Sequence, residues 1–296
     1  MRLSVVIPTR NRREQLLRTL DALDAQAIDP SAVELVVCDN ASTDGTSEAL
    51  RERRGRLALI SLSEPREGAS MARNRALAAA TGDVVLLLGD DMVPAHDDLL
   101  AGHLAAHKSQ PDDGFGVLGH IDWAEPVSEF MQWLERAGFQ FAYHLAQPGE
   151  VDVAKHLYSS HTSFKRAALL DAGGFDERFP FLMEDIELGI RLARRGARLD
   201  YRPDLRVLHH HAHTVDSFAP RLEATGAAGA LLRELYPREA PPEILGPNWK
   251  WPLYPPSAVI AQVILRAGLG GTLREKAWTA ILMARYRRGW LRTARR

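Results

Sequence analysis

The sequence predicts an α/β protein whose helices surround a mostly parallel, doubly wound sheet. Short apolar segments alternate with segments whose apolar residues recur at helical spacing. One apolar run, 84–88, leads directly into two carboxylates, Asp90 and Asp91. The chain has 296 residues, of which 46% are hydrophobic, so it can bury a sizeable core.

Four strands are expected in the first 90 residues, and helices are expected between them. Five consecutive apolar residues, Val84 to Leu88, are typical of a strand buried on both faces. The predicted strands are 3–7, which stops at Pro8, then 33–37, 57–62 and 84–88. The predicted helices are 12–23, a segment from the turn residues 42–45 to about residue 54, and 69–80.

The pattern is looser after Asp91. We expect helices at 94–108 and 184–195, short strands at 199–201 and 207–208, and an irregular, aromatic-rich segment at 120–160. Prolines at 237, 241, 242 and 247 indicate a linker, and two helices broken at 268–271 follow from residue 257. The sequence therefore predicts a catalytic domain at 1–236 and a linker with a helical C-terminal extension at 237–296.

Charge and cysteine content limit the class of protein. The net charge is −1, but residues 247–296 carry ten Lys and Arg and one acid, a net +9. A single cysteine, Cys38, excludes a disulfide framework and fits a reducing compartment. No signal peptide is expected, and no apolar run reaches the ~18 residues of a transmembrane helix. We expect a cytoplasmic protein, peripheral on the inner face of the membrane if the tail binds lipid.

Asp90 and Asp91 are the first candidate site residues. Two carboxylates at the end of a buried strand are costly to desolvate unless a cation or a polar ligand meets them. The carboxyl ends of strands in open α/β sheets are where ligands bind. The pair therefore predicts an enzyme that uses a metal and a phosphate-bearing substrate.

Several motifs occur in a fixed order along the chain. They are VIPTRNR (6–12), DNASTDGT (39–46), GASMARN (68–74), LGDDMVP (88–94), GGFDE (173–177) and EDIELGIRL (184–192). Together they resemble the family 2 glycosyltransferases of the GT-A fold, over roughly residues 1–230. The resemblance implies an inverting enzyme that takes a nucleotide-diphosphate sugar and a divalent cation, Mn²⁺ or Mg²⁺.

The resemblance implies a donor site at the strand ends. Asp39 corresponds to the acid that binds the nucleotide base, although an Asx turn with Ser42 is the alternative. Arg73 would pair with a phosphate or with Asp90 and Asp91, or serve as a structural ion pair. Asp44 fits a helix cap better than a ligand. The predicted donor-binding residues are Pro8, Thr9, Arg10, Asp39, Asn40, Arg73 and Asp90.

The resemblance also assigns the metal and the base. Gly89 replaces the first acid of the family's metal motif, which leaves Asp91 as the expected direct ligand and the role of Asp90 open. A histidine of the tract 209–213, His209 or His211, is the expected second protein ligand. Asp185, with Glu184 beside it at a predicted helix start, corresponds to the catalytic base that takes the proton of the acceptor hydroxyl.

The tail and the aromatic segment suggest the acceptor side. Basic residues alternate with Trp and Tyr in the tail, which suits an anionic membrane surface and a lipid-linked acceptor. A helical cap or a homodimer contact is the alternative, and no nucleic-acid reader motif accompanies the charge. Aromatic residues at 120–160 and the histidine tract are expected to shape a glycan acceptor site.

Two rival functions share the predicted sheet. A sugar nucleotidyltransferase would need a glycine-rich phosphate loop near the N-terminus, which residues 8–12 lack. A non-catalytic nucleotide-sugar binding protein is favoured slightly by Gly89 and opposed by the intact Glu184 and Asp185. The preferred interpretation is a glycosyltransferase of bacterial glycan or cell-envelope polysaccharide synthesis.

Overall fold

The computed structural model describes residues 1–241, 244, 246–248 and 250–294. Pro242 of the predicted linker and Trp249, Arg295 and Arg296 of the predicted tail lie outside the described residues. The chain forms two compact units, the first from residues 1–126 and 138–211, the second from 127–137 and 212–296. The sequence had placed residues 212–236 in the catalytic domain, whereas here they belong to the second unit.

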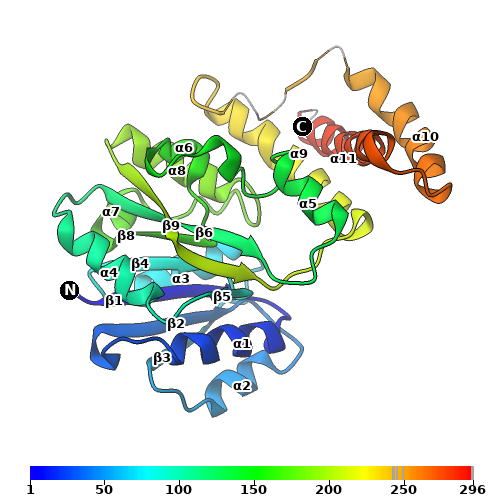
Figure 1. Cartoon of the computed structure of the whole chain (residues 1–296). Helices are drawn as coiled ribbons and strands as arrows, with labels where there is room; N and C mark the ends of the chain where they lie inside the picture. Colours follow the sequence, from blue (N-terminus) through cyan, green and yellow to red (C-terminus); the bar gives the residue numbers. More distant parts are fainter. Residues whose placement is uncertain (242–243, 245, 249, 295–296) are drawn as a thin grey trace. The chain divides into compact units, whose positions relative to one another are not determined.

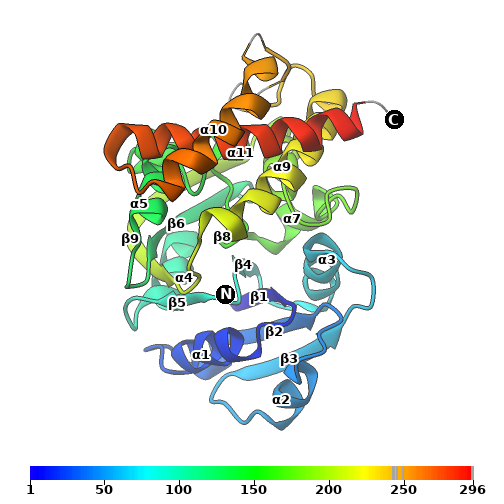
Figure 2. The same ribbon diagram turned by 90° about the vertical axis from the view of Figure 1, so that its right-hand side faces the viewer.

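The first half of the first unit is a parallel, doubly wound sheet. Its strands are β1 (Leu3–Thr9), β2 (Val33–Asp39), β3 (Ala58–Ser63) and β4 (Val84–Leu88), in the spatial order β3-β2-β1-β4. The intervening helices are α1 (Arg13–Asp24), α2 (Thr46–Glu52) and α3 (Ala69–Ala79). In Figures 1 and 2, α1 and α3 lie on opposite sides of these strands. The α/β fold predicted from the sequence is confirmed.

The second half of the first unit extends the sheet with mixed pairing. The added strands are β5 (Met92–Pro94), β6 (Phe115–Trp123), β7 (Gly149–Val151), β8 (His161–Lys165) and β9 (Arg198–His209). β8 runs antiparallel between β4 and β6, which the sequence did not predict. The helices here are α4 (Leu99–Ser109), α6 (Val153–His156), α7 (Arg166–Asp171) and α8 (Glu184–Arg194).

The expectation of two short strands at 199–201 and 207–208 was wrong in one respect. They are parts of one strand, β9, whose pairing with β6 jumps from Arg202 opposite Gly119 to Arg206 opposite His120. Pro203 lies in the unpaired bulge. A proline is tolerated there, because its lack of a backbone N–H costs the sheet no hydrogen bond. The bulge lets β9 continue to His209 beside β5.

Burial explains why these strands form. Every residue of β2 and β4 is buried, because each strand is covered on both faces. β3 lies at the edge of the sheet and is only partly buried. The polar residues that follow β1, β2 and β4 consequently come together at one edge of the sheet.

The second unit is helical. It contains α5 (Glu129–Arg136), α9 (Val215–Leu235), α10 (Tyr254–Arg266) and α11 (Gly271–Thr293), and α11 packs along both α9 and α10. The backbones of α9 and α11 approach closely at glycines. A Cβ at Gly226 would lie 2.0 Å from the Tyr286 carbonyl oxygen, and one at Gly289 would lie 1.7 Å from that of Glu223. These two positions therefore require glycine.

Four aromatic residues of the tail do not lie at its surface. Trp251, Trp278, Tyr286 and Trp290 are all buried inside the second unit. Trp278 packs against Phe130 and Trp133 of α5, which the sequence had assigned to the acceptor site. Aliphatic side chains are exposed instead, at Leu253, Val259, Ile260, Val263, Leu269 and Leu273. No helix among the described residues has the length and apolarity needed to cross a membrane.

Candidate functional site

Asp90 and Asp91 lie in the turn after β4 and are almost fully buried, with 6% and 5% of their surfaces exposed. The turn is held by polar contacts to α1 and to the end of β1. Thr9 donates from Oγ1 to Asp90 Oδ2 over 2.8 Å, and Thr19 donates to the Asp90 carbonyl oxygen over 2.9 Å. The carboxylates are therefore fixed in place by the strand pairing of β1 with β4.

Arg12 is the residue beside these acids that the sequence did not assign to the site. Its guanidinium contacts Asp90 Oδ1 at 3.2 Å and also bonds Asp91 Oδ2. Arg73, for which the sequence left open a phosphate, these acids or a structural ion pair, forms an ion pair with Glu184. The available signal was the position of Arg12 just after β1, since neighbouring parallel strands place their C-terminal residues at one edge.

Two histidines face the same carboxylate. His209 Nε2 lies 3.2 Å from Asp91 Oδ2, and His211 Nδ1 lies 3.9 Å from that atom. The pairing of β5 with β9, which places His209 opposite Met92, brings them there. The strand ends at His209, so His211 and His213 lie beyond β9. His213 belongs to the second unit.

The donor set fits a divalent cation that shares its ligands with a substrate. Among the residues that the structure describes, no group of three or more His, Cys, Asp or Glu side chains could hold a metal alone. Mg²⁺ bound with nucleotides uses one or two carboxylates plus phosphate oxygens and water. Asp91 supplies such a carboxylate, with the imidazole of His209 beside it.

The two adjacent acids have opposite pKa shifts. Burial, reinforced by the charge of Asp91, raises the pKa of Asp90 to about 6. Burial alone would raise the pKa of Asp91 too, but the hydrogen bond and charge of His209, together with Arg12, lower it below its ordinary value. Asp91 is therefore the carboxylate that stays ionised to the lower pH.

Gly89 leaves room for Asp91. A Cβ at position 89 would lie 3.0 Å from both Asp91 Oδ1 and Met92 Cγ. A longer acidic side chain there would crowd the carboxylate. In this turn, the glycine that replaces the first acid of the family's pattern therefore avoids a close contact with the Asp91 carboxylate.

Asp39 ends β2 in the turn geometry that the sequence gave as the alternative to base binding. Its Oδ1 accepts from the backbone N–H of Ser42 over 3.0 Å, and its Oδ2 accepts from the Ser47 hydroxyl. Asn40 bridges the neighbouring loop, donating to the Arg66 carbonyl and accepting from the Gly68 N–H, each over 2.7 Å. Each Asp39 oxygen keeps a second acceptor direction for a ligand.

The other predicted donor-site residues lie around this edge. Pro8 and Thr9 are paired with Cys38 and Asp39 across β1 and β2. Arg10 forms an ion pair with Glu67 over 2.5 Å. Asp44 accepts from the backbone N–H of Arg13 and Thr46, the first residues of α1 and α2, as expected of a cap.

Glu184 and Asp185 begin α8, but their surroundings differ. Glu184 is buried and pairs with Arg73, whose Nη1 donates to Glu184 Oε1 over 2.8 Å. Asp185 is partly exposed, and its Oδ1 accepts from the N–H of Ile186. Burial is the main cause that raises the pKa of Tyr158, and the negative charge of Asp185 raises it further. The two side chains are therefore close enough to interact electrostatically.

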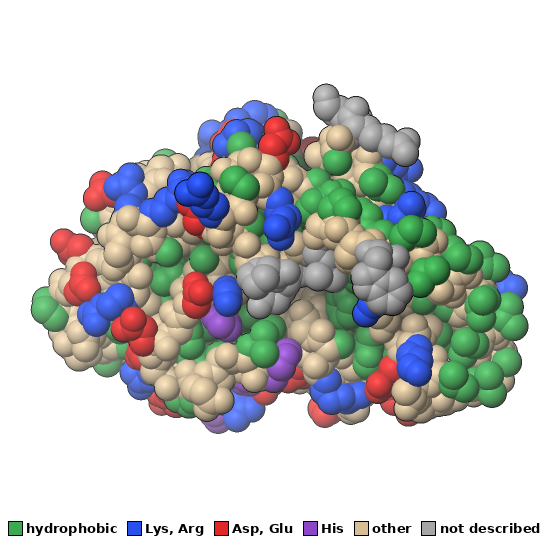
Figure 3. Space-filling model, turned by 90° about the horizontal axis from the view of Figure 1, so that it is seen from above, with side chains coloured by type: hydrophobic (Ala, Val, Ile, Leu, Met, Phe, Trp, Pro, Cys, Tyr) green, Lys and Arg blue, Asp and Glu red, His purple; other side chains and the backbone are tan. Residues whose placement is uncertain are grey.

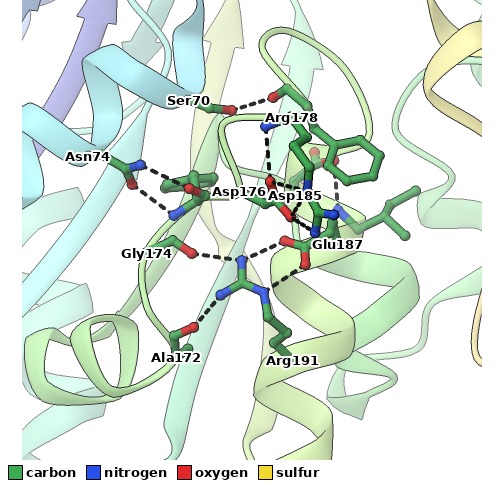
Figure 4. Close-up of polar contacts among 12 residues, drawn as sticks. Ser70, Asn74, Ala172, Gly174, Asp176, Arg178, Asp185, Glu187 and Arg191 are labelled. Atoms are coloured by element: carbon green, nitrogen blue, oxygen red, sulfur yellow. Dashed lines mark hydrogen bonds and ion pairs between the residues drawn. The ribbon is translucent and has the colours of Figure 1, made fainter. Parts of the chain in front are cut away.

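A polar network holds the loop before α8 (Figure 4). Arg191 pairs with Glu187 over 2.5 Å and donates to the carbonyl oxygens of Ala172 and Gly174. Asn74 of α3 both donates to and accepts from the backbone of Phe175, over 2.9 and 2.8 Å. The GGFDE and GASMARN motifs therefore fix one loop that leads into Asp185.

Aromatic rings gather beside His209. Trp123 stacks on His209 with ring centroids 5.2 Å apart, and Phe141 meets the same imidazole edge-on at 5.8 Å. Phe141 also contacts Tyr158, at 5.5 Å. Within the segment 120–160, Trp123 and Phe141 thus lie in the first unit beside His209, with Tyr158 next to Phe141, whereas α5 belongs to the second unit.

Comparison with known proteins gives consistent matches. The model of "Glycosyl transferase family 2" matches residues 4–172. A Bacillus subtilis (strain 168) protein described as an uncharacterized glycosyltransferase, YfnE, is 27% identical over 257 residues, covering 71% of this chain. The chain spans only 64% of the length of that relative.

Two further matches carry more specific names. The N-acetylglucosaminyl-diphospho-decaprenol L-rhamnosyltransferase of Mycobacterium tuberculosis (strain ATCC 25618 / H37Rv) is 28% identical over 251 residues, covering 72% of this chain and 77% of that protein. The mannosyltransferase PcManGT from Pyrobaculum calidifontis, solved with GDP-Man and Mn²⁺, has a TM-score of 0.66 at 23% identity, covering 98% and 87% of the two chains. At that identity the likeness concerns the fold alone.

Proposed function

Because this chain belongs to glycosyl transferase family 2, we propose that it moves a sugar from a nucleotide-diphosphate sugar to an acceptor hydroxyl with inversion at the anomeric carbon. The observation that carries this proposal is the buried pair Asp90 and Asp91, held at the sheet edge beside His209. The sugar nucleotidyltransferase and the non-catalytic binding protein are the rival functions.

The donor would lie along the ends of β1, β2 and β4. Asp39 would accept from a base N–H, and the ends of these strands, with Pro8, Thr9, Arg10 and Asn40, would line the nucleotide pocket. The support is their common position at one edge, where parallel sheets bind ligands.

Asp91, with His209 or His211, would hold the divalent cation. When bound, such a cation offsets negative charge on the leaving nucleoside diphosphate. Arg12 contacts both acids in this structure. If a cation replaced Arg12 on Asp91, the guanidinium would be free to bond the diphosphate. Asp90 would keep the turn in place through Thr9 and Thr19.

Asp185 would accept the proton of the acceptor hydroxyl as that oxygen attacks the anomeric carbon. The partial exposure of Asp185 supports this role. Glu184 forms an ion pair with Arg73 and would position the start of α8. Trp123, Phe141 and Tyr158 would stack on the apolar faces of sugar rings near this base.

We also propose that the acceptor is lipid-linked and that the second unit attaches the enzyme to the cytoplasmic face of a membrane. The relative from M. tuberculosis carries diphospho-decaprenol in its name. Exposed aliphatic side chains and the net +9 charge of residues 247–296 support attachment, in place of the buried aromatic residues.

Nucleotide binding and transfer test the proposed function together. We expect a UDP- or GDP-linked sugar to raise the melting temperature, more so with Mn²⁺, and transferred sugar to have the opposite anomeric configuration by NMR. Binding without hydrolysis or transfer would favour the binding protein. Release of diphosphate from a nucleoside triphosphate and a sugar phosphate would favour the nucleotidyltransferase.

Asp185→Asn separates the base from the binding residues. We expect turnover to fall by about 10²–10⁴ with donor affinity unchanged, because a positioned base contributes that much. Asp171→Asn, an exposed acid at the end of α7, is the matched control and should keep full turnover. Near-normal turnover by Asp185→Asn would move the role to another residue.

A further inference from the structure

A groove of about 850 Å³ lies in the second unit and is lined by α9, α10 and α11. Its lining includes a single acid, Asp216, among the residues that the structure describes there. Five arginines line it as well: Arg266, Arg285, Arg287, Arg288 and Arg292. The groove is therefore strongly basic.

The groove has more positive charges than nearby carboxylates to neutralise them. Arg285, Arg288 and Arg292 follow one face of α11 and all contact a single carboxylate, Glu223, at 3.2, 3.7 and 2.5 Å. The Nε of Arg287 is buried and has no hydrogen-bond partner within the described part of the chain. Like charges at helical spacing repel one another, so an added anion would relieve this crowding.

Apart from Gln262, the rest of the lining is apolar. Ala219 comes from α9, Ala258 and Leu265 from α10, and Ile281 and Leu291 from α11. Inorganic phosphate would use the guanidinium groups and leave these side chains without contact. An occupant that matches the whole groove has an anionic head and a hydrocarbon chain.

An exposed aliphatic face adjoins the groove on α10. Val259 belongs to both, and it is 67% exposed, while Ile260 and Val263 beside it are 62% and 63% exposed. Figure 3 shows hydrophobic side chains gathered over this end of the second unit, with Lys and Arg side chains at their edge. A surface of this kind fits the boundary between lipid headgroups and acyl chains.

We propose that the groove of α9, α10 and α11 binds one anionic membrane lipid, with its phosphate on Arg266 and Arg287 and the first part of its chain along the apolar lining. This proposal rests on the membrane attachment proposed above and narrows it to a single site. It goes beyond a diffuse basic surface because it requires a head and a chain in the same ligand.

Calorimetric titration of the full chain tests the site without a membrane. The probe is dihexanoyl phosphatidic acid below its micelle concentration, with inorganic phosphate in a second titration. We expect one molecule of the lipid to bind per chain, and inorganic phosphate to bind at least tenfold more weakly. Equal affinities would overturn the lipid assignment and leave a phosphate site.

A matched pair of double variants tests the location. Arg266→Gln with Arg287→Gln should weaken lipid binding at least tenfold. Lys276→Gln with Arg238→Gln removes the same charge from exposed positions of the second unit outside the groove and should change binding less than twofold. Equal losses would reduce the effect to net charge and overturn the groove. If the first variant melts early, Arg266→Gln alone serves.

Vesicle co-sedimentation separates this proposal from its premises. Val263→Asp should lower partitioning onto phosphatidylcholine vesicles containing phosphatidic acid, yet leave binding of the short-chain lipid intact. Lipid binding with no partitioning by the wild type would reject membrane attachment and keep the site. A lipid-free dimer that Val263→Asp dissociates in sedimentation would give the face to a second copy and overturn the proposal. Nucleotide affinity, measured on the same variants, reports separately on the sugar-transfer function.

Discussion

Asp90 and Asp91 follow β4, and on the neighbouring strand β8 a second set of buried polar side chains faces α4. There His103 and His107 both contact the Ser163 hydroxyl, at 2.8 and 2.9 Å, and His103 lies 3.1 Å from His161. The acids have Arg12 and His209 as partners, whereas the histidines of the second cluster contact the Ser163 hydroxyl and each other. The two clusters are equally buried and differ in charge.

The difference separates a site from a structural element. Burial lowers the pKa of His107 to about 4 and that of His161 to about 3, so these rings are neutral at pH 7. Asp91 stays ionised, because its contacts with His209 and Arg12 offset the effect of burial on its pKa. A protein that holds an unfavourable buried charge at a sheet edge is prepared for a ligand of opposite charge.

The largest expected effect is at the acids. Asp91→Asn should lower kcat/KM by about 10³ and abolish the response to Mn²⁺, because electrostatic stabilisation by a bound cation contributes several kcal/mol. Asp204→Asn, an exposed acid paired with Arg202, is the matched control and should keep both. Retention of Mn²⁺-dependent transfer by Asp91→Asn would remove Asp91 from the cation site.

The second largest expected effect is a loss of protein stability at acidic pH that is caused by the histidine cluster. Because the folded pKa values lie below the unfolded value near 6.5, the unfolded chain binds more protons and stability falls as pH drops below about 6.5, down to about 4 for His107. Asp90 has the opposite effect on stability. Its pKa is raised to about 6, so at this residue the folded chain binds up to one proton more than the unfolded chain. Each of the three histidines contributes a loss of about 2 kcal/mol between pH 7 and 5 and Asp90 offsets about 1 kcal/mol, so we expect a net loss of about 4 kcal/mol.

Urea unfolding at several pH values measures this effect. His107→Gln can still bond Ser163 and should reduce the pH dependence by the contribution of one histidine. A stability that stays level from pH 7 to 5 in the wild type, or an unchanged slope in the variant, would contradict a neutral buried cluster.

The two clusters also differ in how far the sequence predicted them. The apolar run before Asp90 and Asp91 indicated a strand end, and the family resemblance pointed to His209 or His211. Arg12 was missed because its contact with Asp91, 79 residues away, depends on β1 pairing with β4. Nothing local distinguishes a ligand acid from one that meets an arginine.

The histidine cluster was not predicted at all. His103 and His107 have helical spacing, but their burial depends on β8, an antiparallel strand that no local pattern indicated. The tail was predicted as two helices, and the break at 268–271 was correct. Its buried aromatic residues were not foreseen, because α9 and α5 supply the surfaces that cover them.

Arg12→Gln should have a moderate effect on stability. It leaves two buried carboxylates with less positive charge, so unfolding free energy without divalent cation should fall by about 1–2 kcal/mol, limited by the 35% exposure of Arg12. Mn²⁺ should restore most of this loss, since it replaces the missing charge. Arg206→Gln, exposed and paired with Asp122, should show little loss and no Mn²⁺ rescue. Failure of Mn²⁺ to rescue Arg12→Gln would separate the arginine from the cation site.

The smallest effect comes from two threonines that donate to different atoms of the same aspartate. Thr9 bonds the Asp90 carboxylate and Thr19 bonds its carbonyl oxygen, at 2.8 and 2.9 Å. At pH 8, where the carboxylate is ionised, Thr9→Val should cost about 2 kcal/mol of unfolding free energy and Thr19→Val about 1 kcal/mol, because bonds to charged groups are stronger. Below the Asp90 pKa of about 6 the carboxyl is protonated, so near pH 5 the two costs should converge. A constant difference between the variants at both pH values would mean that Asp90 does not titrate in this range, and the contrast between its pKa and that of Asp91 would be lost.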